Sequence, residues 1–290
     1  MNSVYEKKHS PFQIIMILVC IAFIAAILFP LMNIVATSLS GKNAIAKGLV
    51  GIFPVEFTLE AYEMVFTNSN IVHSLFFSLA LTIGYALLAT FLTILAAYPL
   101  SKTDLKGRHF FLVLITVTMY VSAGTVPNYL LVKNLHLMNT VWALVLPSLI
   151  SPFNLIILRT FFTGINKALY EAAYMDGCGE WGCLFQITIP LSLPSIFTVM
   201  LFYAVSRWNS VTDVLYYINR TELYTLQYQL KMMLDTLTIP YKPEEMATLL
   251  ITPENVKCST IVFAMVPMLI VYPFVQKYFT KGMMIGGVKE

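Results

Sequence analysis

The sequence predicts an all-α membrane protein with six transmembrane helices, both termini in the cytoplasm and a short cytoplasmic helix between the fourth and fifth spans. Of its 290 residues, 58% are hydrophobic and only 11% are charged, whereas soluble domains carry about 25% charged residues. Six apolar runs each have roughly the 20 residues that a helix needs to cross a hydrocarbon core. Strands of a membrane barrel would be about half as long and would alternate in polarity. One membrane domain, residues 1–290, accounts for the whole chain.

The six apolar runs define the predicted spans: residues 12–36, 74–98, 110–132, 139–158, 188–206 and 258–276. The first run is too long for the apolar part of a signal peptide, so we interpret it as a retained span. Pro30 lies near its outer end and is expected to kink it. Gly124 and Pro127 interrupt the third run, and Pro267 and Pro273 lie inside the sixth.

Two outer segments join these spans and contain helical patterns of their own. In the segment 37–73, a short amphipathic helix is expected over Leu59–Thr67, with Thr58 as its N-cap. The larger region 207–257 contains an amphipathic stretch, Leu223–Leu237. One interpretation of this stretch is a helix lying on the membrane surface.

The distribution of basic residues sets the orientation. The segments predicted to be cytoplasmic are residues 1–11, 99–109, 159–187 and the tail 277–290. They hold ten of the 18 Lys and Arg residues. The other eight are spread over many more residues on the opposite side. This asymmetry places both termini inside.

The interiors of the six predicted spans contain no Asp, Glu, Lys or Arg. Carriers driven by protons or sodium need such groups near the midplane, and catalysis inside the bilayer needs an acid, a base or a metal site. The chain also lacks a phosphate-binding GxxxxGK[ST] loop, so another polypeptide must supply the driving energy. The cysteines Cys20, Cys178, Cys183 and Cys258 have no metal-like or redox spacing. The net charge of +3 is too small to indicate nucleic-acid binding.

The stretch from Glu171 to Pro194, which joins the fourth and fifth predicted spans, is central to the interpretation of the chain. A helical run ends at Gly177, which can take the left-handed conformation that stops a helix. A second short segment follows, with Trp181, Leu184 and Phe185 at roughly helical spacing. Two short helices joined by a tight turn would form a compact projection, which we call the knob. Such a projection is suited to a cleft on another protein. An ordinary interhelical loop would fit the spacing equally well.

This stretch resembles the EAA motif of binding-protein-dependent ABC importer permeases, in their carbohydrate-uptake branch typified by the maltose transporter. The matching residues are Glu171, Ala172, Ala173, Gly177, Ile187 and Pro190, with Asp176, Phe185 and Pro194 as in the sugar importers. The flanks Ala97–Lys102 and Arg207–Asn209 and the glycine-containing tail are also similar, so the likeness covers nearly the whole chain. Cys178 departs from the usual alanine, and Asn166 stands where proline is frequent.

The resemblance implies a permease subunit of a bacterial plasma-membrane importer that works by alternating access. Its implied partners are a second homologous permease, two ATPase subunits, an extracellular solute-binding protein and membrane lipid, but no nucleic acid. ATP and Mg²⁺ would bind the ATPase subunits, and this chain would be neither an enzyme nor a cofactor carrier. The coupling loop, residues 168–187, would contact the ATPase through Glu171, Ala172, Ala173, Asp176, Gly177 and Trp181. Glu171 would pair with a basic group there, unless it is simply a solvated helix residue.

Polar and aromatic residues inside the spans are candidates for the substrate pathway: Tyr85, Tyr120, Asn128, Tyr129, Asn154 and Tyr203, with Ser122 and Ser206. Hydroxyls and aromatic faces suit a sugar, but the same groups also serve plain helix packing. The break at Gly124–Pro127 is the best pointer, since unwound backbone at membrane depth is tolerated where it lines a cavity.

The implied substrate is an oligosaccharide, and no residue identifies the sugar. With this resemblance, the stretch Leu223–Leu237 has a second interpretation, as a lid that meets the solute-binding protein. Two other functions remain open for the chain: a stand-alone secondary carrier for a neutral solute, and a structural membrane protein that transports nothing.

Overall fold

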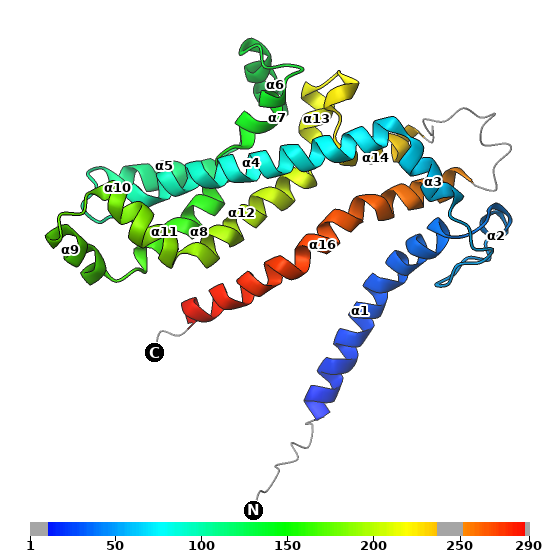
Figure 1. The fold of residues 1–290 in the computed structure, drawn as a ribbon, viewed down its shortest axis with the longest axis horizontal. Coiled ribbons are helices and arrows are strands. Elements are labelled where there is room, and N and C mark those ends of the chain that lie inside the picture. Colours follow the sequence, from blue (N-terminus) through cyan, green and yellow to red (C-terminus); the bar gives the residue numbers. More distant parts are fainter. Residues whose placement is uncertain (1–10, 237–251, 288–290) are drawn as a thin grey trace, which may run out of the picture. The chain divides into compact units, whose positions relative to one another are not determined.

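The computed structural model describes residues 11–236 and 252–287, and these residues form helices and loops without a β-strand (Figure 1). The predicted helical fold class is therefore confirmed. The contacts group the chain into two compact units. One contains Met1–Asn68 and Met232–Met265, and the other contains Ser69–Lys231 and Val266–Glu290.

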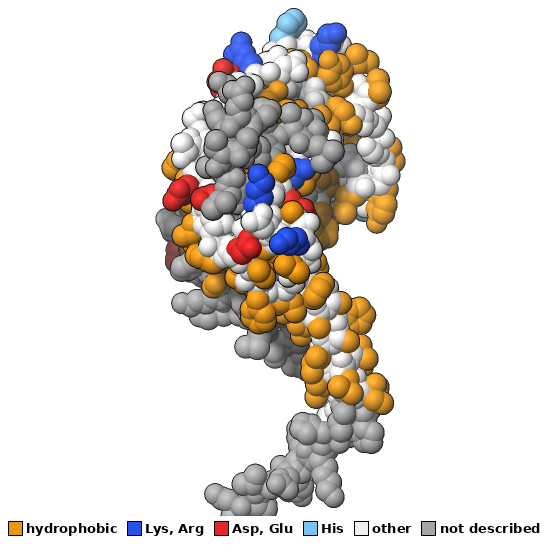
Figure 2. Space-filling model, turned by 90° about the vertical axis from the view of Figure 1, so that its right-hand side faces the viewer, with side chains coloured by type: hydrophobic (Ala, Val, Ile, Leu, Met, Phe, Trp, Pro, Cys, Tyr) orange, Lys and Arg blue, Asp and Glu red, His pale blue; other side chains and the backbone are white. Residues whose placement is uncertain are grey.

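The first unit contains the helices α1 (Pro11–Ser38), α2 (Lys42–Ala46) and α3 (Glu60–Thr67). Helix α1 matches the first predicted span and continues through Pro30. Hydrophobic side chains cover it in the lower part of Figure 2. Helix α3 begins one residue later than predicted: Leu59 is its N-cap, and the Thr58 hydroxyl accepts a hydrogen bond from the Glu60 amide at 3.3 Å.

In the second unit the helix α4 (Ser69–Ser101) forms the centre, packed against α8 (Pro152–Thr163) and α12 (Leu193–Trp208). Its buried face follows a spacing of three to four residues through Ala86, Ala89, Thr93 and Ala97. Small side chains let neighbouring helix backbones approach closely. Through α8 and α12, this helix contacts two of the three bent segments described next.

Three predicted spans are bent. The pair α5 (Arg108–Tyr120) and α6 (Thr125–Asn134) turns by 114° at the expected break before Pro127. The predicted fourth span is not one helix, because α7 (Val141–Val145) and the 3₁₀ turn η1 (Leu146–Ser148) meet α8 at 53°. Its last helix also continues to Thr163, beyond the predicted end. A proline disfavours helical backbone in the residue before it, and Ser151 before Pro152 is extended.

The predicted fifth span also begins later than expected. The helical run Glu180–Leu191 meets α12 at 82°, so the span helix starts at Leu193 rather than near Thr188. Pro194 in the first turn of α12 is favourable because it lacks only an amide that would be unpaired there.

The number of spans depends on how these pairs are counted. Within the described residues, two helices alone are long and apolar enough to cross a membrane, Ile15–Ser38 and Ser69–Ser101, and up to five spans result if each bent pair is one. The sixth predicted span lies in α16 (Pro253–Gly287), which remains helical into the predicted tail 277–290.

The region 207–257, predicted to lie outside the membrane, contains α13 (Thr212–Tyr217), the 3₁₀ turn η3 (Thr221–Leu223) and α14 (Leu226–Thr236). Helix α14 corresponds to the amphipathic stretch predicted over Leu223–Leu237, whose last residue lies outside the described residues. Leu226 and Leu230 on its apolar side are buried, and the Leu226 amide donates to the Ser78 hydroxyl at 2.8 Å. This part of the apolar side therefore packs within the protein.

Candidate functional site

The knob predicted between the fourth and fifth spans is built on α9 (Lys167–Met175). Asn166 is its N-cap, and its side-chain oxygen accepts a hydrogen bond from the Ala168 amide at 3.0 Å. Such a bond satisfies one of the unpaired amides in the first helical turn. Asn166, which stands where related motifs often have proline, therefore acts as the N-cap of α9.

The predicted stop at Gly177 is confirmed by its backbone φ of 79°. The Gly177 amide donates to the Tyr174 carbonyl at 3.0 Å, and the Cys178 amide donates to the Ala173 carbonyl at 2.9 Å. These two bonds form a Schellman motif, in which glycine takes the left-handed position without a steric penalty. Four residues, 176–179, therefore separate α9 from the helical run that begins at Glu180.

The second arm of the knob runs through α10 (Glu180–Gly182), the π-helical turn η2 (Cys183–Thr188) and α11 (Ile189–Leu191). The two arms are joined by a buried hydrogen bond of 2.8 Å between the hydroxyls of Tyr170 and Thr188. Since the Thr188 hydroxyl donates to the Cys183 carbonyl at 3.1 Å, Tyr170 is the donor to Thr188. This bond fixes α9 against the second arm.

The predicted coupling residues fall on different sides of the knob. Those that are exposed are Glu171, Ala172, Asp176, Gly177 and Trp181. Ala173 is half-buried and packs against the protein's own core, so it supports the knob from within.

The exposed side of α9 also presents apolar residues that sequence reasoning missed. Leu169 is exposed, and Met175 is 88% exposed. Leu169, Ala172 and Met175 recur every three residues, and this spacing could have identified a common face. We define the outer face of the knob as Leu169, Glu171, Ala172, Met175 and Asp176.

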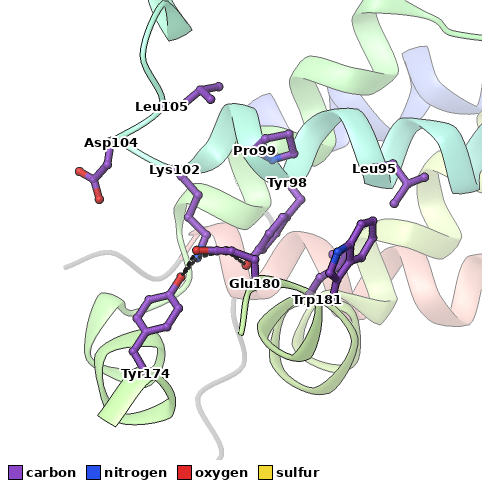
Figure 3. A pocket seen from close by; sticks show the side chains of 10 residues that line it. Leu95, Tyr98, Pro99, Lys102, Asp104, Leu105, Tyr174, Glu180 and Trp181 are labelled. Carbon is purple, nitrogen blue, oxygen red and sulfur yellow. Dashed lines mark hydrogen bonds and ion pairs between the residues drawn. The ribbon is translucent and has the colours of Figure 1, made fainter. Parts of the chain in front are cut away.

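A polar cluster that we did not predict ties the knob to the end of α4 (Figure 3). Tyr98 donates to one carboxylate oxygen of Glu180 and Tyr174 donates to the other, both at 2.7 Å. Lys102 Nζ lies 3.1 Å from the Tyr174 hydroxyl and 3.9 Å from the Glu180 carboxylate. We call these four residues the Glu180 cluster.

Lys102 is held by aromatic rings as well as by the carboxylate. Its ammonium lies 3.6 Å from the centre of the Tyr170 ring and 4.8 Å from that of Tyr98. Partly desolvated cation–π contacts of this kind contribute about 0.5–2 kcal/mol. The α4 end of the cluster is therefore fixed to α9 through Tyr170 and to α10 through Glu180.

The charges of the cluster are matched. Partial burial raises the pKa of Glu180, but the hydrogen bonds from Tyr98 and Tyr174, together with the Lys102 ammonium, bring it below its ordinary value. Burial and the Glu180 carboxylate raise the pKa of Tyr174, so its phenol stays protonated and remains a donor. The cluster therefore holds an ionised carboxylate between protonated donors at neutral pH.

A crevice of about 520 Å³ lies beside the cluster. It is lined by Leu95, Tyr98, Pro99, Lys102, Asp104, Leu105, Tyr174, Glu180, Trp181 and Leu184 (Figure 3). Leu184 is buried within the chain, whereas Trp181 is exposed and stacks on the exposed Phe185 with ring centres 6.2 Å apart. Of the three aromatic and apolar residues noted in the second arm, only Leu184 packs mainly on the protein's own helices.

Four of the predicted pathway residues, Tyr85, Asn154, Tyr203 and Ser206, lie together in one pocket of about 350 Å³. Its lining comprises Tyr85, Ser148, Ile150, Ser151, Phe153, Asn154, Phe202, Tyr203 and Ser206. The pocket therefore surrounds the break between η1 and α8, where the backbone leaves helical geometry. Irregular backbone at membrane depth is expected where it lines such a cavity.

Tyr203 organises this pocket. Its hydroxyl accepts a hydrogen bond from the Ser151 amide at 2.9 Å and lies 2.7 Å from the Thr93 hydroxyl. Tyr85 donates to the Ser148 carbonyl, and its ring packs edge-on against that of Tyr203. Backbone groups freed by the helix break are thus bonded by tyrosine hydroxyls.

The other predicted pathway residues are not in this pocket. Tyr120 is 83% exposed and Asn128 is exposed, while Tyr129 packs at the margin of the core. The predicted break around Gly124–Pro127 is present in the structure. The pocket, however, is lined by residues around the other break, before Pro152. Serine followed by proline inside an apolar run was the signal for it.

A buried ion pair lies at the end of α12. Arg207 is 4% exposed, pairs with Asp213 and donates to the Leu144 carbonyl at 2.6 Å. Asp213 also accepts from the Ser210 hydroxyl at 2.7 Å. The pair thereby connects α12, α13 and α7.

Comparison with known proteins gives this arrangement a family. Residues 89–285 match the family model described as the binding-protein-dependent transport system inner membrane component. The chain belongs to this family. The matched region contains the knob, the Glu180 cluster and, apart from Tyr85, the residues that line the pocket around Tyr203.

Individual relatives agree with the family assignment. The chain is 41% identical to the protein LplC of Bacillus subtilis over 91% of this chain and 90% of that protein. It is 36% identical to the polygalacturonan/rhamnogalacturonan transport system permease protein YtcP of the same organism, over 99% of both chains. Its fold is similar to that of one chain in the crystal structure of a bacterial ABC transporter involved in the import of the acidic polysaccharide alginate. That similarity has a TM-score of 0.90 and 29% identity, and it covers 96% of this chain and 100% of the other.

These similarities confirm the resemblance to carbohydrate ABC importer permeases drawn from the EAA motif. They also confirm an inner-membrane protein, in agreement with its long apolar helices. YtcP and the relative AraQ of Halalkalibacterium halodurans are named as transport system permease proteins.

Proposed function

We propose that this protein is a permease subunit of an ATP-driven, binding-protein-dependent importer of oligosaccharides. It would cross the membrane six times with both termini in the cytoplasm. The family, the relative named for polygalacturonan/rhamnogalacturonan transport and the similar chain from an alginate importer support this substrate class. The single observation that carries the coupling role is the knob: its outer face is exposed, while hydrogen bonds and the Glu180 cluster hold its inner face.

The outer face of the knob is proposed to dock on an ATPase subunit that binds ATP and Mg²⁺. Met175 and Leu169 offer apolar contact, Ala172 permits close approach, and Glu171 and Asp176 offer charge. A few central residues contribute most of the energy of a protein interface, and methionine is enriched in such interfaces. A second permease, a second ATPase subunit and an extracellular solute-binding protein complete the proposed assembly.

The Glu180 cluster provides a route from this dock to the pathway. Tyr98 lies in the last turn of α4 and Lys102 directly follows the helix, and Tyr85 lies about 20 Å from Tyr98 along the same helix, at about 1.5 Å per residue. A displacement of α9 would move the end of α4 through Glu180. Alternating access would then change the packing of Tyr85 against Tyr203.

The pocket around Tyr203 is proposed as this chain's part of the translocation pathway. Its hydroxyls, the Asn154 amide and the rings of Phe153 and Phe202 can contact sugar hydroxyl groups and C–H surfaces. The lining has no charged side chain. This chain would therefore recognise hydroxyl groups rather than the carboxylate of an acidic sugar.

Co-purification of the tagged protein from native membranes tests the proposal. The wild type should bring down a nucleotide-hydrolysing subunit in mild detergent. The Glu171→Ala variant should lose that subunit or its transport-linked hydrolysis, whereas Glu222→Ala, at an exposed position in η3, should keep both. Absence of any ATPase with the wild type would refute the proposal and favour a stand-alone carrier. Intact uptake in Glu171→Ala would remove the coupling role.

A further inference from the structure

The segment that follows α1 exposes a group of large apolar side chains. They are Leu49, Ile52, Phe53, Phe57 and Leu59, with Phe53 76% exposed. Isolated apolar residues on a surface need no explanation, but a group this close in sequence marks an interaction surface. The segment also has a defined structure, which shows where these residues lie relative to α1.

The segment folds back along α1 (Figure 1). The Asn33 side-chain amide donates to the Gly51 carbonyl at 2.9 Å and to the Val50 carbonyl at 3.3 Å. Asn33 precedes the end of α1 at Ser38 by five residues, a distance of about 7.5 Å along a helix. Residues 50–51, and with them Leu49 and Ile52, therefore lie level with the last turns of an apolar membrane helix.

Backbone hydrogen bonds hold the end of this segment, residues 55–58, against residues 39–41. The Thr58 amide donates to the Leu39 carbonyl and the Gly41 amide donates to the Val55 carbonyl, both at 3.0 Å. The buried Ser40 hydroxyl accepts from the Val55 amide at 3.1 Å. The loop is thus tied to the chain beyond the end of α1 at one level and to Asn33 at a deeper level.

Charge follows the same division. Lys42 lies beyond the end of α1 at the start of α2, and Glu56 packs against Gly41 at that level. The residues nearest to the Asn33 level, from Gly48 to Phe53, are uncharged. Apolar side chains on the membrane side and charged ones on the water side are typical of a segment lying in the membrane interface.

We propose that residues 49–53 insert into the leaflet at the carboxyl end of α1, as an interfacial anchor whose partner is the lipid bilayer. The surface continues that of α1, which has no buried residue in its most apolar window. The exposed Phe53 ends the segment and the exposed Phe57 follows it, and phenylalanine is one of the side chains that interfacial segments bury at the boundary between headgroups and acyl chains. This anchor fixes the height and rotation of α1 in the membrane. It depends on the membrane placement of α1 alone, so its failure would leave the coupling proposal untouched.

Quenching by brominated lipid tests this anchor in the full chain, reconstituted with its co-purifying partners. Phe53→Trp adds an indole at the proposed depth, and Asn43→Trp adds one on exposed α2 beyond the end of α1 as a matched control. Tryptophan fluorescence is measured in phosphatidylcholine vesicles whose acyl chains are brominated near the headgroup. The wild-type emission is subtracted from that of each variant to remove the signal of the three native tryptophans. Quenching of the Phe53→Trp signal should be at least twofold stronger than that of Asn43→Trp.

A second variant tests the geometry. Adding Asn33→Ala to Phe53→Trp removes the two bonds that hold the loop beside α1 and should reduce the quenching. Equal quenching of Phe53→Trp and Asn43→Trp would overturn the proposal. In that case, blue-shifted emission from Phe53→Trp would show that a protein partner covers the segment, and red-shifted emission would show that it faces water.

Discussion

Replacing Glu180 with alanine should loosen the knob from α4 without unfolding the span bundle. The variant removes the acceptor for both the Tyr98 and the Tyr174 hydroxyls and the counter-charge of Lys102. The Tyr170–Thr188 bond between the two arms remains. The expected change is therefore local to the attachment of α9 and α10.

The size of the effect follows from these contacts. A hydrogen bond to a charged group contributes about 1.5–3 kcal/mol when it is shielded from water. The Glu180 side chain is 62% exposed, so solvent screening reduces this value for each bond. We expect a loss of about 1–2 kcal/mol in total, which corresponds to about a 5- to 30-fold change in an equilibrium constant.

Amide hydrogen exchange of residues 167–182, in the protein reconstituted without the proposed ATPase subunits, measures this loss directly. Glu180→Ala should speed exchange there by about the same factor, and Tyr174→Phe, which removes one of the two bonds, by less. Glu171→Ala is the matched control, since this exposed residue lies on the outer face. If Glu180→Ala and Glu171→Ala exchange at the same rate as the wild type, the cluster does not hold the knob.

Other predictions follow from the same structure. Because the folded pKa of Glu180 is lowered, its contribution is present above its ordinary pKa of 4.5 and lost as the pH falls through the folded value. Exchange of residues 167–182, corrected for intrinsic rates, should therefore be constant from about pH 8 to 6 and faster only below about pH 4.5. Gly182→Ala should lower the thermal unfolding midpoint in detergent, because its Cβ would overlap Cys178 Sγ, and adding Cys178→Ala should restore it. Asp213→Ala should destabilise the protein by about 3 kcal/mol or more by leaving Arg207 buried and unpaired, whereas Arg207→Met with Asp213→Leu should cost less in the same measurement.

The sequence could predict the parts of the fold that depend on composition and local chemistry. Apolar length located α1 and α4, and the conformational freedom of glycine located the turn at Gly177. The EAA motif could also be predicted, because its residues, among them Glu171, Ala172 and Gly177, lie at fixed spacing within one continuous stretch of sequence.

The parts that it could not predict depend on contacts between distant segments. Tyr98 and Glu180 are 82 residues apart, and nothing in either neighbourhood indicates that they meet. Tyr203 and Ser151 are likewise brought together by the packing of α12 against α8.

The bends of the fourth and fifth spans were missed for a different reason. Hydropathy continues across Ser151–Pro152, so apolar length alone indicates one helix there. The proline chemistry that ends the preceding helical segment is local and was available in the sequence.

The central claim, that the outer face of the knob docks on an ATPase, is tested most directly by site-specific photo-crosslinking. A benzophenone amino acid replaces Met175, the most exposed apolar residue of that face. Leu131, exposed on α6, receives the same replacement as a control. After irradiation of native membranes, position 175 should crosslink to a nucleotide-binding subunit and position 131 should not. Crosslinks from position 175 to lipid or to this chain alone would contradict the account.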